Sequence, residues 1–252
     1  MNQLFKKVIL LILISLFLSC NVSSKDSQKI NKNYNSKQKK DEILQDSIIN
    51  GSELTKEEIA KIFTPNTIKK IDVKFEIYKV YIYQDVLGKH YLIFTENVKE
   101  GYIADENKVV NKIKAIDVLS NDNFKIISTI NDHINEYEKS LWFWTRYLSL
   151  EDFDQDGYID PIVIYGSESI YGSEKFDEGR IMILIYYKGK KIGIRHQNSE
   201  YDDGRHTQID KAYYFLPKKI KQQVFNKIKL LEERGHALFN SETIRNFEKA
   251  IK

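Results

Sequence analysis

Four aspartates within nine residues constrain this chain more than any other feature of its sequence. They are Asp152, Asp154, Asp156 and Asp160, and Gly157 follows the third of them. Carboxylates this close repel one another unless a positive charge lies between them, and alternate positions of a tight loop can point to the same side. Glycine allows the sharp turn that such a loop needs. Because all the candidate ligands are oxygen atoms, the pattern predicts calcium and not zinc or copper.

The residues on either side indicate that this loop joins two strands. The segment 141–148 is strand-like in composition, and the run 161–165 is β-branched and begins with a proline. In an EF-hand the twelfth loop position is a bidentate glutamate and helices flank the loop, whereas here that position is Val163. A switching EF-hand is therefore excluded. An acidic hairpin turn that binds no ion remains the simpler alternative.

The strand–loop–strand setting resembles the calcium loop of integrin-type FG-GAP and VCBS repeats. A propeller of such repeats needs the motif to recur in each blade, but here the motif occurs once. We therefore expect a single calcium loop, residues 152–160, set into another kind of sheet as a structural clip. The resemblance implies side-chain ligands and one backbone carbonyl ligand, which are Asp152, Asp154, Asp156 and Asp160, and the carbonyl of Tyr158.

The N-terminus has the features of a lipoprotein signal. Two lysines precede the apolar stretch 8–18, which is too short to span a bilayer, since that needs about 20 residues. The sequence Phe17-Leu18-Ser19-Cys20 resembles the lipobox of bacterial lipoproteins, although Phe17 stands where leucine is usual. The resemblance implies that residues 1–19 are a signal peptide and that Cys20 carries a lipid. An ordinary secretory signal with an incidental cysteine is the alternative.

The polar segment that follows predicts a tether. Residues 20–51 contain few apolar side chains, so they are expected to be disordered, and they reach roughly 100 Å when extended. Residues 52–252 suit one domain with its own core. We therefore expect a protein anchored to the membrane through the lipid on Cys20, at the Gram-negative outer membrane or cell surface. Its tethered domain would lie on the periplasmic or the outer face.

Charge and motif content exclude several classes of function. The formal net charge is +3, of which the signal contributes two lysines, and no long basic run follows, so we expect no nucleic-acid binding. Cys20 is the only cysteine, which excludes a disulfide framework or zinc cluster within one chain. A nucleophile elbow, a P-loop and a dinucleotide fingerprint are also absent from the sequence.

The periodicity predicts an α+β fold with one mostly antiparallel sheet of about eight strands. An N-terminal helix caps this sheet, and it begins at the capping box Thr55-Lys-Glu-Glu58 and stops at Pro65. A clear hairpin joins 180–187 to 191–195. Two C-terminal helices, one after Pro217 and one from about Ser241, pack on the sheet. Further strands are predicted at 71–83, 90–94, 113–119 and 124–130.

Two other sets of residues are candidates for ligand binding. Trp142 and Trp144 share one face of their predicted strand, where they either stack on a sugar ring or belong to the core. The polar stretches 167–174 and 195–206 are predicted to be exposed loops, which often carry function. A metal or acid–base cluster in the second stretch would use His196, Asp202, Asp203 and His206.

Three functions are compatible with these features. The first is a non-enzymatic, calcium-stabilised binding or accessory module of the cell envelope, with a glycan or an envelope protein as partner. The second is a role in surface polysaccharide biosynthesis or export, because 152–165, 180–197 and Leu216-Pro217 resemble envelope lipoproteins labelled surface polysaccharide biosynthesis proteins. The third is an envelope hydrolase, which needs two carboxylates across a cleft. Its nominal candidates are Glu168, Glu174, Asp202 and Asp203.

Overall fold

The structure is a computed structural model that describes residues 50–99, 108–120, 124–171 and 178–252. Residues Ser47–Lys252 form one compact unit. The predicted signal peptide, Cys20 and all of the predicted tether before Asn50 lie outside the described residues. Among the helices that are described, none combines the length and the apolar character needed to cross a membrane.

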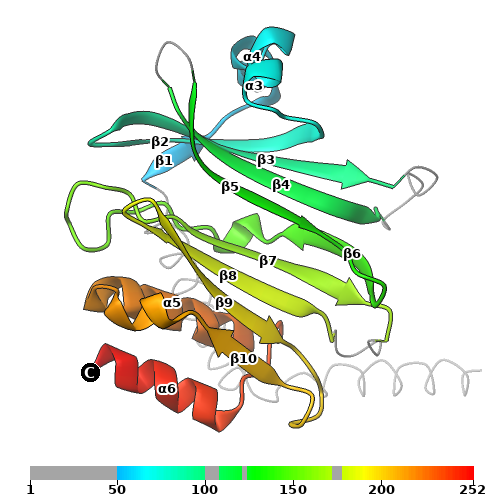
Figure 1. The fold of residues 1–252 in the computed structure, drawn as a ribbon, viewed down its shortest axis with the longest axis vertical. Coiled ribbons are helices and arrows are strands. Elements are labelled where there is room, and N and C mark those ends of the chain that lie inside the picture. Colours follow the sequence, from blue (N-terminus) through cyan, green and yellow to red (C-terminus); the bar gives the residue numbers. More distant parts are fainter. Residues whose placement is uncertain (1–49, 100–107, 121–123, 172–177) are drawn as a thin grey trace, which may run out of the picture. The chain divides into compact units, whose positions relative to one another are not determined.

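The described strands form two five-stranded antiparallel sheets (Figure 1). Sheet 1 has the order β1-β2-β3-β4-β5, and sheet 2 has the order β10-β9-β8-β7-β6. The strands of sheet 1 are Gly51–Glu53, Glu76–Asp85, Gly88–Val98, Val110–Leu119 and Lys125–His133, numbered β1 to β5. Those of sheet 2 are Glu138–Phe143, Ile162–Ser169, Arg180–Tyr187, Lys190–Gln197 and His206–Ile209, numbered β6 to β10. The predicted α+β class and antiparallel pairing are confirmed, but the prediction of a single sheet is wrong.

Burial on both faces of the central strands explains why two sheets form. β3 is buried along most of its length, so both of its faces need a covering layer. On one side that layer is sheet 2, because Phe94 of β3 meets Phe143 of β6 with ring centroids 4.8 Å apart. The central apolar layer between the sheets also contains residues such as Leu141 and Val163. Two further apolar layers lie on the outer faces of the sheets.

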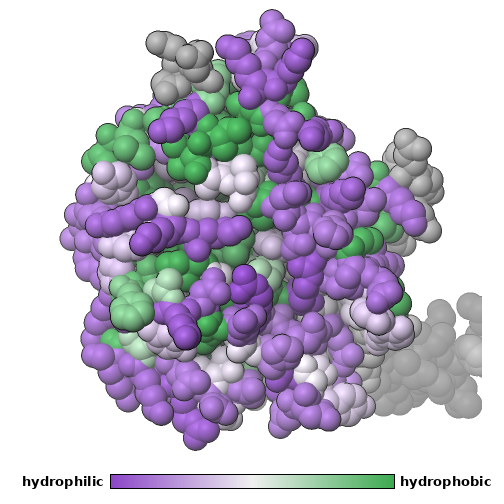
Figure 2. All heavy atoms as spheres, in the orientation of Figure 1, coloured by the Kyte–Doolittle hydropathy of each residue, from purple (hydrophilic) through white to green (hydrophobic). Residues whose placement is uncertain are grey.

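Helices cover the outer faces of both sheets (Figure 1). α3 (Lys56–Ile62) and α4 (Pro65–Lys70) lie over sheet 1, while η2 (Lys211–Phe215), α5 (Lys218–Glu233) and α6 (Ser241–Ile251) belong to the side of sheet 2. On the face drawn in Figure 2, hydrophilic residues cover most of the α5–α6 layer and the outer side of α3 and α4, and hydrophobic residues show mainly between them, toward sheet 1. The order of layers is thus helices, sheet 1, sheet 2 and helices.

The predicted capping signals agree with the observed helix ends. Thr55 and Glu58 form both hydrogen bonds of a capping box at the start of α3. α3 ends at Ile62 with Phe63 as its C-cap, as predicted, but Pro65 then begins a second helix that was not predicted, α4, in whose first turn its missing N–H is not needed. Both C-terminal helices form as predicted, and Gly235 takes a positive φ of 73° directly after the C-cap residue of α5.

Two predicted segments end differently from the expectation. The predicted strand 141–148 stops at Phe143, and a 3₁₀ turn, η1 (Thr145–Tyr147), follows and places Tyr147 in the core. The predicted exposed loop 195–206 is shorter, because β9 continues to Gln197 and β10 begins at His206. Both differences come from tertiary pairing, which extends or ends strands independently of local composition.

Candidate metal site

Reciprocal backbone bonds close the aspartate-rich loop at its base. Ser149 and Ile162 exchange N–H···O bonds of 3.0 and 2.9 Å, and the Asp160 N–H donates to the Glu151 carbonyl at 2.9 Å. Gly157 has a φ of 92°, which supplies the predicted sharp turn. The loop therefore leaves and re-enters sheet 2 at one point. Strand β7, which contains Val163, follows the loop, as the predicted strand after it required.

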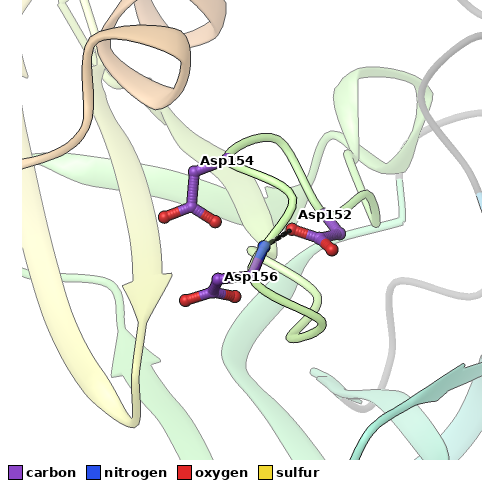
Figure 3. A group of neighbouring side chains, drawn as sticks. All are labelled: Asp152, Asp154 and Asp156. Carbon is purple, nitrogen blue, oxygen red and sulfur yellow. Dashed lines mark hydrogen bonds between the residues drawn. The ribbon is translucent and has the colours of Figure 1, made fainter.

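Hydrogen bonds inside the loop turn the aspartates toward one another. Asp152 accepts bonds from the N–H groups of Asp156 (3.0 Å) and Gly157 (2.8 Å), and Asp156 accepts one from the N–H of Tyr158 (3.0 Å). One carboxylate oxygen from each of Asp152, Asp154 and Asp156 lies within 4.8 Å of the other two. Figure 3 shows these three side chains leaving the same loop. Their geometry can hold a metal ion.

Asp160 adds a buried carboxylate beside the three. It is fully inaccessible to solvent, and its Oδ2 accepts the Phe153 N–H at 3.1 Å. Its Oδ1 is buried without a hydrogen-bond partner among the described residues. Burial, together with the charges of Asp154, Asp156 and Asp152, raises the pKa of Asp160 to about 7. A buried carboxylate without a counter-charge is costly, so this position favours a bound cation.

The hairpin between β8 and β9 contacts the outer side of the cluster. The Tyr187 hydroxyl donates to Asp154 Oδ2 at 3.2 Å, whereas Asp154 Oδ1 is buried without a hydrogen-bond partner in the described part of the chain. The Lys188 ammonium lies 2.9 Å from Asp156 Oδ2, and this hydrogen bond lowers the pKa of Asp156. One exposed lysine balances only part of the charge of four aspartates.

Apolar side chains of the loop anchor it in two different cores. Phe153 is buried in the layer between sheet 2 and the C-terminal helices, and Ile159 is buried in the layer between the sheets. The Val86 N–H in the β2–β3 turn donates to the Gly157 carbonyl at 3.0 Å. The loop thus contacts a turn of sheet 1 and a turn of sheet 2 at the same time.

The other predicted polar cluster is not brought together as a metal site. His196 is buried, its Nδ1 lies 2.9 Å from Thr207 Oγ1, and its ring packs 4.2 Å from the Phe239 ring. Burial lowers the pKa of His196 to about 4. Asp202 and Asp203 are exposed. Over the described ranges, Asp152, Asp154 and Asp156 are the only set of three His, Cys, Asp or Glu side chains whose ligand atoms lie within 4.8 Å of one another.

A buried network near the loop was not visible in the sequence. His90 lies between two carboxylates, with Nε2 3.2 Å from Asp85 Oδ1 and Nδ1 3.2 Å from Asp117 Oδ1. The Tyr83 hydroxyl donates to Asp117 at 2.9 Å. Burial alone would lower the pKa of His90, but Asp117 and Asp85 raise it above its usual value. Only the register of three neighbouring strand segments brings these residues together, and no local spacing signals it.

The two tryptophans line a cavity on the helix side of sheet 2. Trp142 and Trp144 are half-buried, and the same cavity reaches Ser167 and Asn198. It therefore joins parts of both predicted polar stretches, although Glu174 lies outside the described residues.

Comparison with known proteins gives no family for this chain: no protein-family model and no solved structure matches it.

Proposed function

We propose that this chain is a calcium-stabilised binding module of the cell envelope, anchored through a lipid on Cys20. Calcium would be bound by Asp152, Asp154, Asp156 and Asp160 and by the carbonyl of Tyr158. Its role would be structural: it would neutralise the four carboxylates and hold the loop against turns of both sheets. The metal would act as a clip, and the binding surface would lie elsewhere on the domain.

The observation that carries the proposal is the buried carboxylate of Asp160 beside the other three. Its unpartnered oxygen and that of Asp154 belong to the same loop, and both are buried. Hard oxygen ligands from carboxylates are the donor set that calcium prefers. An acidic turn that binds no ion would leave these oxygens in water, where their charge costs little.

Thermal unfolding with and without calcium tests the metal site. An extracellular-type site has a Kd of roughly 10⁻⁴–10⁻³ M. At a hundredfold excess over Kd, calcium adds about 2.7 kcal/mol to the free energy of unfolding, which corresponds to a rise in Tm of roughly 5–10 °C. Chelation should reverse the rise, and metal analysis of the protein before chelation should find calcium.

Two isosteric variants make this test specific. Asp160→Asn removes the buried charge and should abolish the calcium-dependent rise in Tm. Asp203→Asn changes an exposed aspartate outside the loop and should retain the whole rise. If calcium added at that excess leaves Tm unchanged and metal analysis of the protein equilibrated with calcium finds none bound, the structural calcium site is refuted.

The cavity beside the tryptophans favours binding over hydrolysis. A hydrolase of the paired-carboxylate type needs two acidic groups facing the substrate. The described residues that line the cavity include no aspartate or glutamate. A part in surface polysaccharide biosynthesis or export remains compatible with a glycan-binding module, and deletion of the gene followed by analysis of capsule and lipopolysaccharide tests it. Unchanged polysaccharides would count against that role.

A further inference from the structure

A cavity of about 410 Å³ lies on the helix-facing side of sheet 2. Its walls come from β6, from η1 and from Gly235 and His236, which directly follow α5. This volume lies within the range of small-molecule sites, about 300–1,000 Å³. The cavity is distinct from the aspartate loop, since no residue of 152–160 lines it.

Aromatic rings form one side of the cavity. Trp144 packs against His236 with ring centroids 5.5 Å apart, and Tyr147 packs against His236 at 5.6 Å. Trp144 also lies over Gly166 of β7, where a Cβ atom would come within 2.5 Å of its ring. The missing side chain at Gly166 therefore seats the indole close to the sheet. Trp142 lines the same cavity and is half-buried.

Among the described residues that line the cavity, the charged side chain is an arginine. Arg146 is exposed, and no ion pair or hydrogen bond joins it to another described residue. The described lining contains no carboxylate that would oppose an anion. Burial, Arg146 and Arg234 together lower the pKa of His236, which favours the neutral ring, able to donate or accept a hydrogen bond.

We propose that this cavity binds a sugar residue that carries a carboxylate, such as a uronic acid. The ring face of the sugar would lie on the indoles, and its carboxylate would pair with Arg146. A planar guanidinium matches a carboxylate with two parallel hydrogen bonds, which separates an acidic sugar from a neutral one. This assignment rests on the proposed binding role and names its ligand class.

Intrinsic fluorescence of the full chain tests the proposal directly, because the only two tryptophans of the sequence both line the cavity. Titration with glucuronate or galacturonate should shift the emission and saturate. Glucose and galactose should bind about tenfold more weakly or not at all, because they lack the charged group. Benzoate, an acid without a sugar ring, should also bind more weakly than either uronate.

A matched pair of variants separates the specific contact from general charge. Arg146→Gln should weaken uronate binding by about tenfold or more and keep the parent Tm. Arg195→Gln removes another exposed arginine, one outside the cavity, and should bind like the parent. Saturable binding of neutral sugars with the same affinity, equal binding of benzoate, or no fluorescence change with either uronate would each overturn the proposal.

The same titrations in calcium and in chelator keep the two proposals apart. Uronate binding that persists while calcium leaves Tm unchanged would refute the metal clip alone. A calcium-dependent Tm without any uronate binding would refute the cavity assignment alone.

Discussion

A buried histidine makes the stability of this fold depend on pH. His196 has a pKa of about 4 in the folded chain, against about 6.5 when exposed. Between these values the unfolded chain binds a proton that the folded chain does not, so stability falls as the pH decreases from about 6.5 to 4, by up to about 3 kcal/mol. Asp160, whose pKa is raised to about 7, has the opposite effect over the same window, so the loss should be measured by urea unfolding as the difference between the parent and a His196→Gln variant.

Variants of two histidines isolate this effect. His196→Gln keeps a hydrogen-bonding group near Thr207 but does not titrate, so its stability should vary less with pH below 6.5. His133→Gln, at an exposed position, should keep the slope of the parent. Equal slopes in the two variants would contradict the role of His196. His90 has a raised pKa and acts in the opposite direction. It stabilises the fold below pH 6.5, and this stabilisation is lost as the pH rises through its folded pKa.

Residues that act within a short segment could be predicted, and residues that meet across strands could not. The aspartates of 152–160 lie within nine residues, so their spacing alone indicated a common loop. His90 and Asp117 are 27 residues apart and meet only because β3 pairs with β4. For the same reason, the sequence suggested a ligand-binding position for Trp142 and Trp144 only as an alternative to the core. The residues of the opposite wall, Gly235 and His236, lie far along the chain, after α5.

At the scale of elements, Arg180 ties three strands together where β8 begins. Its guanidinium lies 2.5 Å from Asp132 of β5 and 2.5 Å from Glu138 of β6. The Tyr165 hydroxyl of β7 also donates to Asp132 at 2.8 Å. This network links sheet 1 to sheet 2, whereas Tyr187 at the other end of β8 contacts the aspartate loop.

Removal of this arginine should be costly. Arg180→Met leaves the half-buried Asp132 and the buried Glu138 without their counter-ion, and we expect a loss of about 2 kcal/mol in the free energy of unfolding, less than for a fully buried pair. Arg195→Met, which breaks one exposed ion pair, should cost no more than about 1 kcal/mol. Urea unfolding of the two variants compares them. Similar losses would show that the network does not stabilise the contact between the sheets.

Elements with strong local sequence signals were predicted correctly, whereas the two short edge strands were not predicted. The β8–β9 hairpin was predicted from a turn at Lys188-Gly189-Lys190; in the structure the turn has two residues, Lys188 and Gly189, and both have positive φ. β1 and β10 have three and four residues and carry mostly polar side chains, so neither composition nor alternation marks them. They are strands only because β2 and β9 offer an edge.

For the whole molecule, the number of layers was the part that local patterns did not determine. A strand that is buried on both faces, such as β8, has the same sequence whether a helix or a second sheet covers it. The central layer joins residues as distant in the chain as Phe94 and Leu184, and such pairing is set by global packing. The predicted single sheet was therefore wrong although most of its strands were placed correctly.

The contacts of the aspartate loop predict how calcium acts on the whole domain. Because Gly157 accepts the Val86 N–H and Tyr187 bonds to Asp154, an ion that fixes the loop should also restrain the β2–β3 and β8–β9 turns. Hydrogen exchange in calcium should therefore slow at both turns and within 152–160. The C-terminal helix α6 has no hydrogen bond to the loop among the described residues, so it serves as the internal reference and should exchange at the same rate in chelator.

Asp160→Asn provides the control for this experiment, since it should exchange in calcium as the parent does in chelator. Slowing confined to 152–160 would mean that the ion stabilises only its own loop. Slowing at both turns would mean that one bound ion restrains both sheets at one end of the sandwich, while Arg180 ties them at the other. Local opening would then require breaking contacts in both sheets at once, which is how a small clip raises the stability of a large domain.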